Sequence, residues 1–99
     1  MNIQRTQNGD KTEFALSGRL DTTTAPQLQE ALIPEFNTVK SVTLDFAGLA
    51  YVSSAGLRVL LMGEKTAKAK GGKQTLVNVS AEIMEVFEMT GFSNVLYFE

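Results

Sequence analysis

Two adjacent serines, Ser53 and Ser54, are the residues of this chain whose type and position favour chemistry. They stand directly before a predicted helix start, where one serine commonly accepts a hydrogen bond from a free backbone amide and so caps the helix. One cap is sufficient. Because Ala55 and Gly56 follow, the second hydroxyl has small neighbours and is open to approach by another protein.

A phosphate on such a hydroxyl would carry about −1.5 to −2 charges beside the positive end of a helix, so the fold should tolerate it. The surface would nevertheless change from neutral and partly apolar to doubly charged. An anion held against an apolar or acidic partner surface is costly to desolvate. The serine pair therefore predicts either a simple helix cap or a binding surface that phosphorylation switches off.

The composition excludes most familiar catalytic sites. The 99 residues include no cysteine, histidine or tryptophan, which removes the thiolate nucleophile, the imidazole base, the conventional zinc site and the disulfide framework. Nine basic and 11 acidic residues give a net charge of −2, which is no signature of nucleic-acid binding. We expect a protein that is not an enzyme and has no metal or other cofactor, and whose partner is another protein rather than a nucleic acid.

Membrane and export signals are also missing from the sequence. No apolar run approaches the roughly 18 residues that a spanning helix needs, and the first ten residues lack the apolar stretch of a signal peptide. We therefore expect a cytoplasmic protein without direct membrane insertion.

The elements that position the serine pair are predicted from hydrophobic periodicity and from turn and cap residues. In chain order we expect a hairpin of strands 2–7 and 12–17, a helix from Ala25, a strand over 41–46, a loop over 47–51, a helix over 55–70, a strand over 74–79, a helix between Ser80 and Gly91, and a final strand over 94–98. Strands that alternate with helices of this length indicate right-handed crossovers and parallel pairing. The predicted class is α/β, a single domain over residues 1–99, with an N-terminal hairpin and parallel crossover strands in a mixed sheet packed against helices.

Local signals predict details of these elements. Asn8-Gly9 readily adopts the positive φ angles of a type I′ turn. Thr24 and Gln27 have the spacing of a capping box. Pro34 lacks an amide hydrogen, so we expect the first helix to break at residues 33–34. Ser80 is expected to cap the third helix.

A second polar segment is predicted at the same sheet end as the serine pair. In open α/β sheets, function collects at the carboxyl ends of parallel strands. Asp21 follows one strand and precedes three threonines. Its carboxylate is expected either to organise the turn before the first helix or to contribute to a partner surface, but not to act as a catalytic base.

Three segments resemble the STAS family: G-R-L-D at residues 18–21, L-D-F-A-G-L-A-Y-V-S-S-A-G-L at residues 44–57 and M-T-G-F at residues 89–92. The resemblance covers nearly the whole chain and is most specific in the central segment. Within the family the chain resembles the bacterial anti-sigma factor antagonists. This implies an STAS-like fold and binding to an anti-sigma factor that is also a serine kinase, with release of a sigma factor. ATP and magnesium would belong to that kinase.

The resemblance also implies which serine is modified. With Gly56 and Leu57 fixing the register, the family's phosphorylated serine falls on Ser54. Its phosphorylation would abolish binding, and a serine phosphatase would restore the active form. The chain departs from the family pattern at Ser53, where Asp is common, and at Ala55, where Ser or Thr is frequent.

The expected partner surface combines the two polar segments. It comprises Asp21, Thr22, Thr23, Thr24, Ser53, Ser54, Ala55, Gly56, Leu57 and Arg58. An alternative function is that of an STAS accessory subunit of a membrane transport ATPase for lipids, because the same fold occurs in such complexes. The S-S-A-G-L motif favours the sigma pathway, whereas co-purification with a transport ATPase would favour the alternative.

Overall fold

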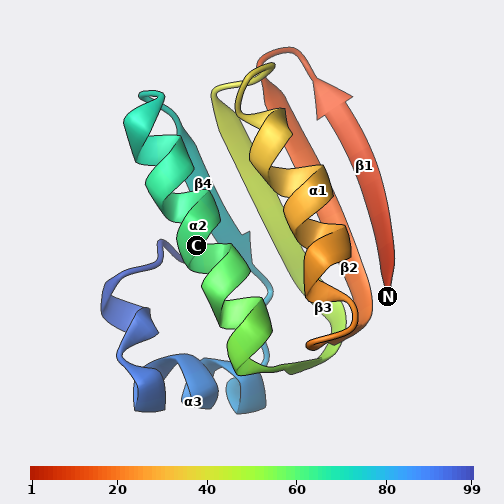
Figure 1. The fold of residues 1–99 in the computed structure, drawn as a ribbon, viewed down its shortest axis with the longest axis vertical. Helices are drawn as coiled ribbons and strands as arrows, with labels where there is room; N and C mark the ends of the chain where they lie inside the picture. The colour runs from red at the N-terminus through yellow and green to blue at the C-terminus, as the bar shows by residue number, and fades with distance from the viewer.

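The computed structural model describes residues 1–99 and contains a four-stranded mixed sheet with α1 and α2 lying over one face (Figure 1). The elements are β1 (Asn2–Asn8), β2 (Lys11–Leu20), α1 (Ala25–Glu35), β3 (Ser41–Val52), α2 (Ser54–Ala69), β4 (Lys73–Val77), α3 (Ala81–Thr90) and the 3-10 helix η1 (Phe92–Asn94). The strand order is β1-β2-β3-β4, with β1 antiparallel to β2 and the other two pairs parallel. The predicted α/β class, with an N-terminal hairpin and parallel strands, is confirmed.

The core lies between the sheet and the helices. Val42, Leu44 and Phe46 alternate along β3 and are all at most 1% exposed, as expected for a strand with one buried face. α3 joins this core through Phe87, whose ring centroid lies 6.2 Å from that of Phe46. None of the helices has the length and apolar character needed to cross a membrane.

The β1–β2 hairpin is confirmed, but its turn differs from the type I′ turn predicted. Asn8 pairs with Lys11, which leaves Gly9 and Asp10 as the central residues. Only Gly9 has a positive φ, of +64°, and a positive φ at the first central residue alone is the pattern of a type II′ turn. Tertiary contacts hold Asp10, because its Oδ1 accepts a hydrogen bond from the Lys40 amide at 3.0 Å.

α1 begins at Ala25 as predicted, but the expected capping box is wrong. Thr24 is the N-cap residue and makes no side-chain cap hydrogen bond. Its hydroxyl instead donates to the carbonyl oxygen of Arg19 at 2.7 Å. The threonine side chain therefore ties the end of β2 to the helix start, and only the Thr24 carbonyl oxygen accepts a hydrogen bond from the Gln27 amide.

The predicted break at residues 33–34 is also wrong, because α1 continues through Pro34 to Glu35. Pro34 lies in the last turn of the helix, where its missing amide removes only one helical hydrogen bond. Leu32, Glu35 and Phe36 are buried around it. Packing of this last turn against the core outweighs the lost hydrogen bond.

β3 is longer than predicted, and the expected loop over residues 47–51 is strand instead. β2 pairs with β3 along this whole segment, from Lys11 to Leu20, with irregularities in register at two points. Gly48 permits the close strand approach, since a Cβ there would lie 2.9 Å from the Ser17 Cβ. A hydrogen-bonded strand therefore carries the chain as far as Val52.

The boundaries of the next elements are close to those predicted. α2 begins and ends one residue earlier than expected. β4 ends at Val77 rather than residue 79, because Asn78 adopts a left-handed conformation with φ of +56°. α3 lies between Ser80 and Gly91 as predicted, and Gly91 has the φ of +80° typical of a helix stop.

The final strand predicted over residues 94–98 is wrong. The short helix η1 ends at Asn94, and a single bridge then pairs Phe98 with Leu76 of β4. The Phe98 ring packs 5.3 Å from that of Phe87. Two backbone hydrogen bonds to Leu76 and this aromatic contact hold the chain end. Neither leaves an alternating pattern in the sequence.

α2 and α3 both follow a serine, but only one of these serines caps its helix. Ser80 Oγ accepts a hydrogen bond from the Ile83 amide at 3.2 Å, as predicted. Ser53 is the N-cap residue of α2 and makes no side-chain cap bond. Its Oγ is buried and has no hydrogen-bond partner within the protein. The structure therefore contains no serine cap at the start of α2.

A partly buried network joins the hairpin to α1. The Arg5 guanidinium donates to Glu35 through Nη2 at 2.7 Å and Nε at 3.1 Å. The Thr12 hydroxyl on β2 donates to the same carboxylate at 2.5 Å. These hydrogen bonds hold the pKa of Glu35 below its ordinary value, and those from Arg5 have the largest effect. The carboxylate thus connects β1, β2 and α1.

We expect Glu35→Ala to lower the free energy of unfolding by about 1–3 kcal/mol at pH 7, because the buried Thr12 hydroxyl loses its acceptor. The lowered pKa means that the contribution of Glu35 is complete above its unfolded value of about 4.5 and is lost as the pH falls through the folded value. Urea unfolding of the wild type and of Glu35→Ala should give a difference in the free energy of unfolding that becomes smaller below pH 4.5. Glu30→Ala, at an exposed site on the same helix, is the control. An equal difference in the free energy of unfolding at pH 7 and pH 3 would contradict a stabilising role for the ionised Glu35 carboxylate.

The two serines at the helix starts give a second, matched prediction. Ser80→Ala should cost about 1 kcal/mol of stability, the usual value of a formed cap. Ser53→Ala should leave stability within about 0.5 kcal/mol of the wild type or raise it, because it removes a buried hydroxyl that has no partner. Thermal and urea unfolding measure both. A loss of 1 kcal/mol or more in Ser53→Ala would show that its hydroxyl is satisfied after all.

Candidate functional site

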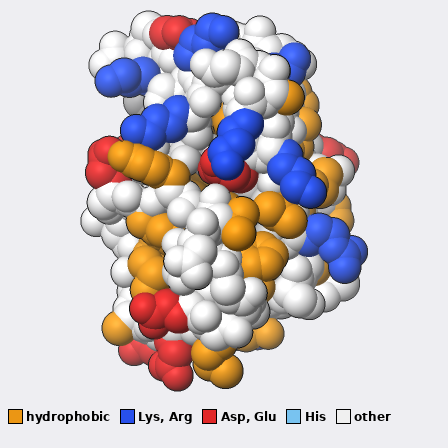
Figure 2. All heavy atoms as spheres, turned by 90° about the vertical axis from the view of Figure 1, so that its left-hand side faces the viewer, with side chains coloured by type: hydrophobic (Ala, Val, Ile, Leu, Met, Phe, Trp, Pro, Cys, Tyr) orange, Lys and Arg blue, Asp and Glu red, His pale blue; other side chains and the backbone are white.

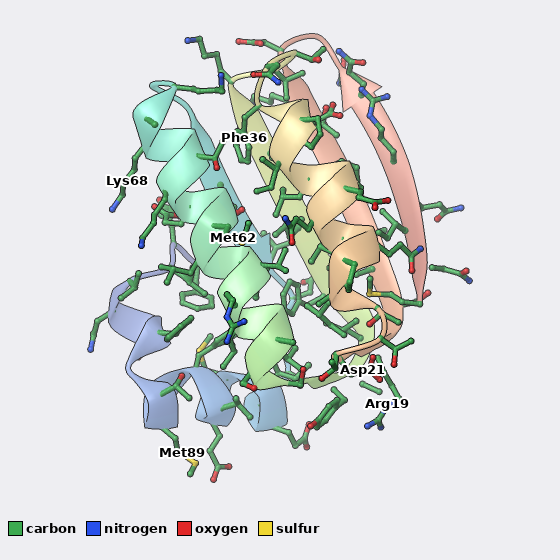
Figure 3. The ribbon with its side chains drawn as sticks, viewed as in Figure 1. Arg19, Asp21, Phe36, Met62, Lys68 and Met89 are labelled. Atoms are coloured by element: carbon green, nitrogen blue, oxygen red, sulfur yellow. The ribbon has the colours of Figure 1, made fainter.

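The carboxyl ends of β2 and β3 bring the two polar segments together. Leu20 pairs with Val52 in the parallel register, and the Ser53 amide donates to the Leu20 carbonyl oxygen at 2.9 Å. The loop that begins at Asp21 and the serine pair therefore lie at the same end of the sheet. Figure 3 shows Arg19 and Asp21 at this end, beside the start of α1.

The first turn of α2 lies directly on β2. A Cβ on Gly56 would lie 2.6 Å from Leu20 Cγ and 3.2 Å from the Leu20 carbonyl oxygen, so only glycine fits without a shift. Leu57 is 5% exposed and belongs to the core. Gly56 and Leu57 therefore hold the helix start against the sheet and present little surface.

The two serines differ sharply in access. Ser54 is the first residue of α2 and is exposed. Ser53 is half-buried, and its Oγ lies out of contact with solvent. Ser54 thus offers a hydroxyl to another protein, whereas Ser53 does not.

The loop after β2 is organised by Asp21. Its Oδ1 accepts hydrogen bonds from the amides of Thr23 at 3.0 Å and Thr24 at 3.1 Å. These hydrogen bonds lower the pKa of Asp21, and the one from the Thr24 amide has the largest effect. The other carboxylate oxygen, Oδ2, lies 3.7 Å from Arg19 Nε. The turn-forming role of Asp21 is therefore present, and Thr22 and Thr23 are left exposed.

An arginine and a tyrosine that the sequence analysis missed lie beside this loop. The Arg19 guanidinium carbon sits 4.3 Å from the centre of the Tyr51 ring, within the range of a cation–π interaction. Tyr51 is 41% exposed. Arg19 and Tyr51 pair across β2 and β3 only after the register has shifted twice. The one available signal was the G-R-L-D segment, which places Arg19 next to Asp21.

The outer side of α2 extends the site away from the sheet. The helix buries residues such as Gly56, Leu60 and Gly63, while Ser54, Arg58 and Lys65 are exposed. These last three lie within a narrow angular range at about 100° per residue, and we refer to them as the α2 stripe. Figure 2 shows the left-hand side of Figure 1, with Lys and Arg side chains gathered over its upper half among a few acidic ones, and further acidic side chains at its lower end, where α3 lies.

The site is a surface rather than a pocket. A hollow of about 500 Å³ lies over β1, β2 and β3, with Ser17, Asp45 and Gly48 in its lining, and contains none of the predicted partner-surface residues. No group of three or more His, Cys, Asp or Glu residues is placed to hold a metal ion. The arrangement of loop, exposed serine and helix is suited to contact with another macromolecule.

Comparison with known proteins agrees with this fold. The family model described as Mlab, STAS domain matches residues 3–97. The chain is 27% identical to the anti-sigma-B factor antagonist of Bacillus subtilis, over 97% of this chain and 88% of that protein. It is 35% identical to BtrV of Bordetella bronchiseptica, a candidate anti-sigma factor antagonist, over 81% of this chain and 70% of the relative.

Solved structures show the same fold. The anti-sigma factor antagonist SpoIIAA in its unphosphorylated form aligns with a TM-score of 0.79 at 19% identity, over 99% of this chain and 87% of that one. Bacillus SpoIIAA in its phosphorylated form aligns with a TM-score of 0.77 at 20% identity, over 99% of this chain and 91% of that one. With a family model that spans nearly all of its residues and sequence relatives named as anti-sigma factor antagonists, the chain belongs to the STAS domain family.

Proposed function

We propose that this protein is an anti-sigma factor antagonist, that its partner is an anti-sigma factor with serine kinase activity, and that phosphorylation of Ser54 ends their binding. The observation that carries the proposal is the accessible Ser54 hydroxyl at the start of α2, beside a serine whose own hydroxyl is buried. The curated relatives named above support the general role.

The difference in access supports Ser54 over Ser53 as the modified residue. A kinase must bring the hydroxyl oxygen into contact with the γ-phosphate of ATP. Ser53 Oγ would have to leave the interior to do so, whereas Ser54 is exposed in the folded protein. ATP and magnesium belong to the kinase, and a serine phosphatase restores the unmodified form.

The proposed contact surface joins the two segments at the sheet end. It comprises Asp21, Thr22, Thr23, Thr24, Ser53, Ser54, Ala55 and Arg58, positioned from beneath by Gly56 and Leu57. Both oxygens of Asp21 are engaged, with the threonine amides and with Arg19. Asp21 therefore contributes chiefly by shaping the loop, with Thr22 and Thr23 exposed to the partner.

The physical basis of the switch is a change of charge on a surface that leaves the core intact. Phosphate adds about −1.5 to −2 charges at the first residue of a 16-residue helix, where the helix dipole favours an anion. The fold should therefore persist. A partner surface that fits the neutral hydroxyl would have to desolvate the phosphate without compensation, which weakens binding.

The test compares Ser54→Ala, Ser54→Asp and Ser54→Asn with the wild type in the native host. We expect phosphate on Ser54 in the wild type, located by intact-mass and fragment-ion analysis. We expect a co-purifying serine kinase to be retained by Ser54→Ala and lost by Ser54→Asp. Ser54→Asn has nearly the size of the aspartate without its charge, so it should bind at least tenfold more tightly than Ser54→Asp in a titration with the purified kinase.

Two results would contradict the proposal. Equal kinase binding by Ser54→Asp and the wild type would remove the charge switch. An unmodified Ser54 together with a transport ATPase partner that is indifferent to all three substitutions would instead identify an accessory subunit of that ATPase. Circular dichroism and unfolding curves of the three variants establish that each retains the fold.

A further inference from the structure

The α2 stripe places an arginine one helical turn beyond Ser54. Residues four apart lie on the same helix face, separated by about 6 Å along the axis. Ser54 and Arg58 are both exposed, whereas Gly56, Leu57 and Val59 among their neighbours are buried. The burial pattern therefore puts both side chains on the outer face of the first turns of α2.

Arg58 is the arginine that the fold leaves unengaged. The chain has three arginines: Arg5 pairs with Glu35, and Arg19 lies against Asp21 and Tyr51. Arg58 takes part in none of the three ion pairs of the structure and in none of its side-chain hydrogen bonds. Its guanidinium is therefore not held by any ion pair or side-chain hydrogen bond of the fold.

The chemistry of the two side chains is complementary once Ser54 carries phosphate. A guanidinium presents N–H donors in a planar fork that matches two phosphate oxygens, and such charge-assisted bonds are about twice as strong as neutral ones. An acidic group followed by a basic group four residues later is also the favourable order on a helix. The unmodified serine has no charge with which to attract the Arg58 guanidinium.

We propose that Arg58 binds the phosphate on Ser54 from within the same helix, so that phosphorylation creates an intramolecular phosphoserine–arginine clamp. This inference rests on the proposed phosphorylation of Ser54. The clamp acts in two ways on the partner surface: it fixes the phosphate over the first turns of α2, and it withdraws the unengaged guanidinium from any acidic group of the partner. Arg58 is here a positioning residue for the switch.

Other charged groups near the sheet end define the controls. Arg19, Asp21 and the phenol of Tyr51 face this end from β2, the following loop and β3. Lys65 lies on the α2 stripe itself, about 16 Å from Ser54 along the helix axis. That separation is about twice the Debye length at physiological ionic strength, so Lys65 should not affect the phosphate.

The test needs neither the kinase nor the partner. Phosphoserine is incorporated at position 54 during translation, and the second pKa of its phosphate, ordinarily about 6, is measured by 31P NMR titration. Because a guanidinium stabilises the dianion, Arg58→Gln should raise this pKa by about 0.3–0.6 pH units. Arg58→Lys should retain much of the effect. Lys65→Gln should leave the pKa unchanged within about 0.1 unit. Arg19→Gln should shift the pKa by less than Arg58→Gln does, because the Arg19 guanidinium is already engaged with Asp21 and Tyr51.

The outcomes separate the clamp from the switch. An unchanged phosphate pKa in Arg58→Gln overturns the clamp, and so does a shift that appears in Arg19→Gln instead. Either result leaves the loss of partner binding in Ser54→Asp as an independent measurement. Conversely, the pKa shift could be found in the phosphoserine protein while Ser54 carries no phosphate in the native host. That pair of results would support the contact between Arg58 and the phosphate and would contradict the proposed function.

Discussion

The contact between Gly56 and Leu20 is the constraint on which the site depends. A Cβ at residue 56 would lie within 2.9 Å of two Leu20 side-chain carbons, and Leu20 is fully buried. The glycine lets the first turn of α2 pack on the end of β2, where the Ser53 amide reaches the Leu20 carbonyl oxygen. Because this contact fixes where the helix begins, it also decides which serine points inward and which faces solvent.

The division of roles between the serines has an energetic cost. A buried hydroxyl without a partner costs about 1–3 kcal/mol, and the cap that Ser53 would ordinarily make is absent. Ser80 shows that the chain forms a normal serine cap elsewhere. Departures from local rules tend to concentrate where function constrains the sequence. The uncapped start of α2, next to an exposed serine, is such a departure, and it falls within the S-S-A-G-L segment.

The sequence was sufficient for the order of the elements from β1 to α3, the α/β class and the helix limits at Ala25 and Gly91, because these depend on local periodicity and cap residues. It was insufficient where tertiary contacts overrode a local signal. Pro34 stays helical because its turn packs on the core, and residues 47–51 stay extended because β2 pairs with them through shifts in register. The same shifts create the Arg19–Tyr51 contact, so no pattern in the sequence alone could have indicated it.

The distribution of the arginines explains how a charge change at Ser54 can alter the surface and spare the fold. Arg5 acts at the far end of α1 from the serine pair, through Glu35 in the last turn of that helix (Figure 1). Arg19 is held by Asp21 and Tyr51 within the sheet-end loop. The ion pairs that support structure are thus already satisfied without Ser54. Because Arg58 takes part in none of the ion pairs, a phosphate one turn away can recruit it without breaking an ion pair of the unmodified fold.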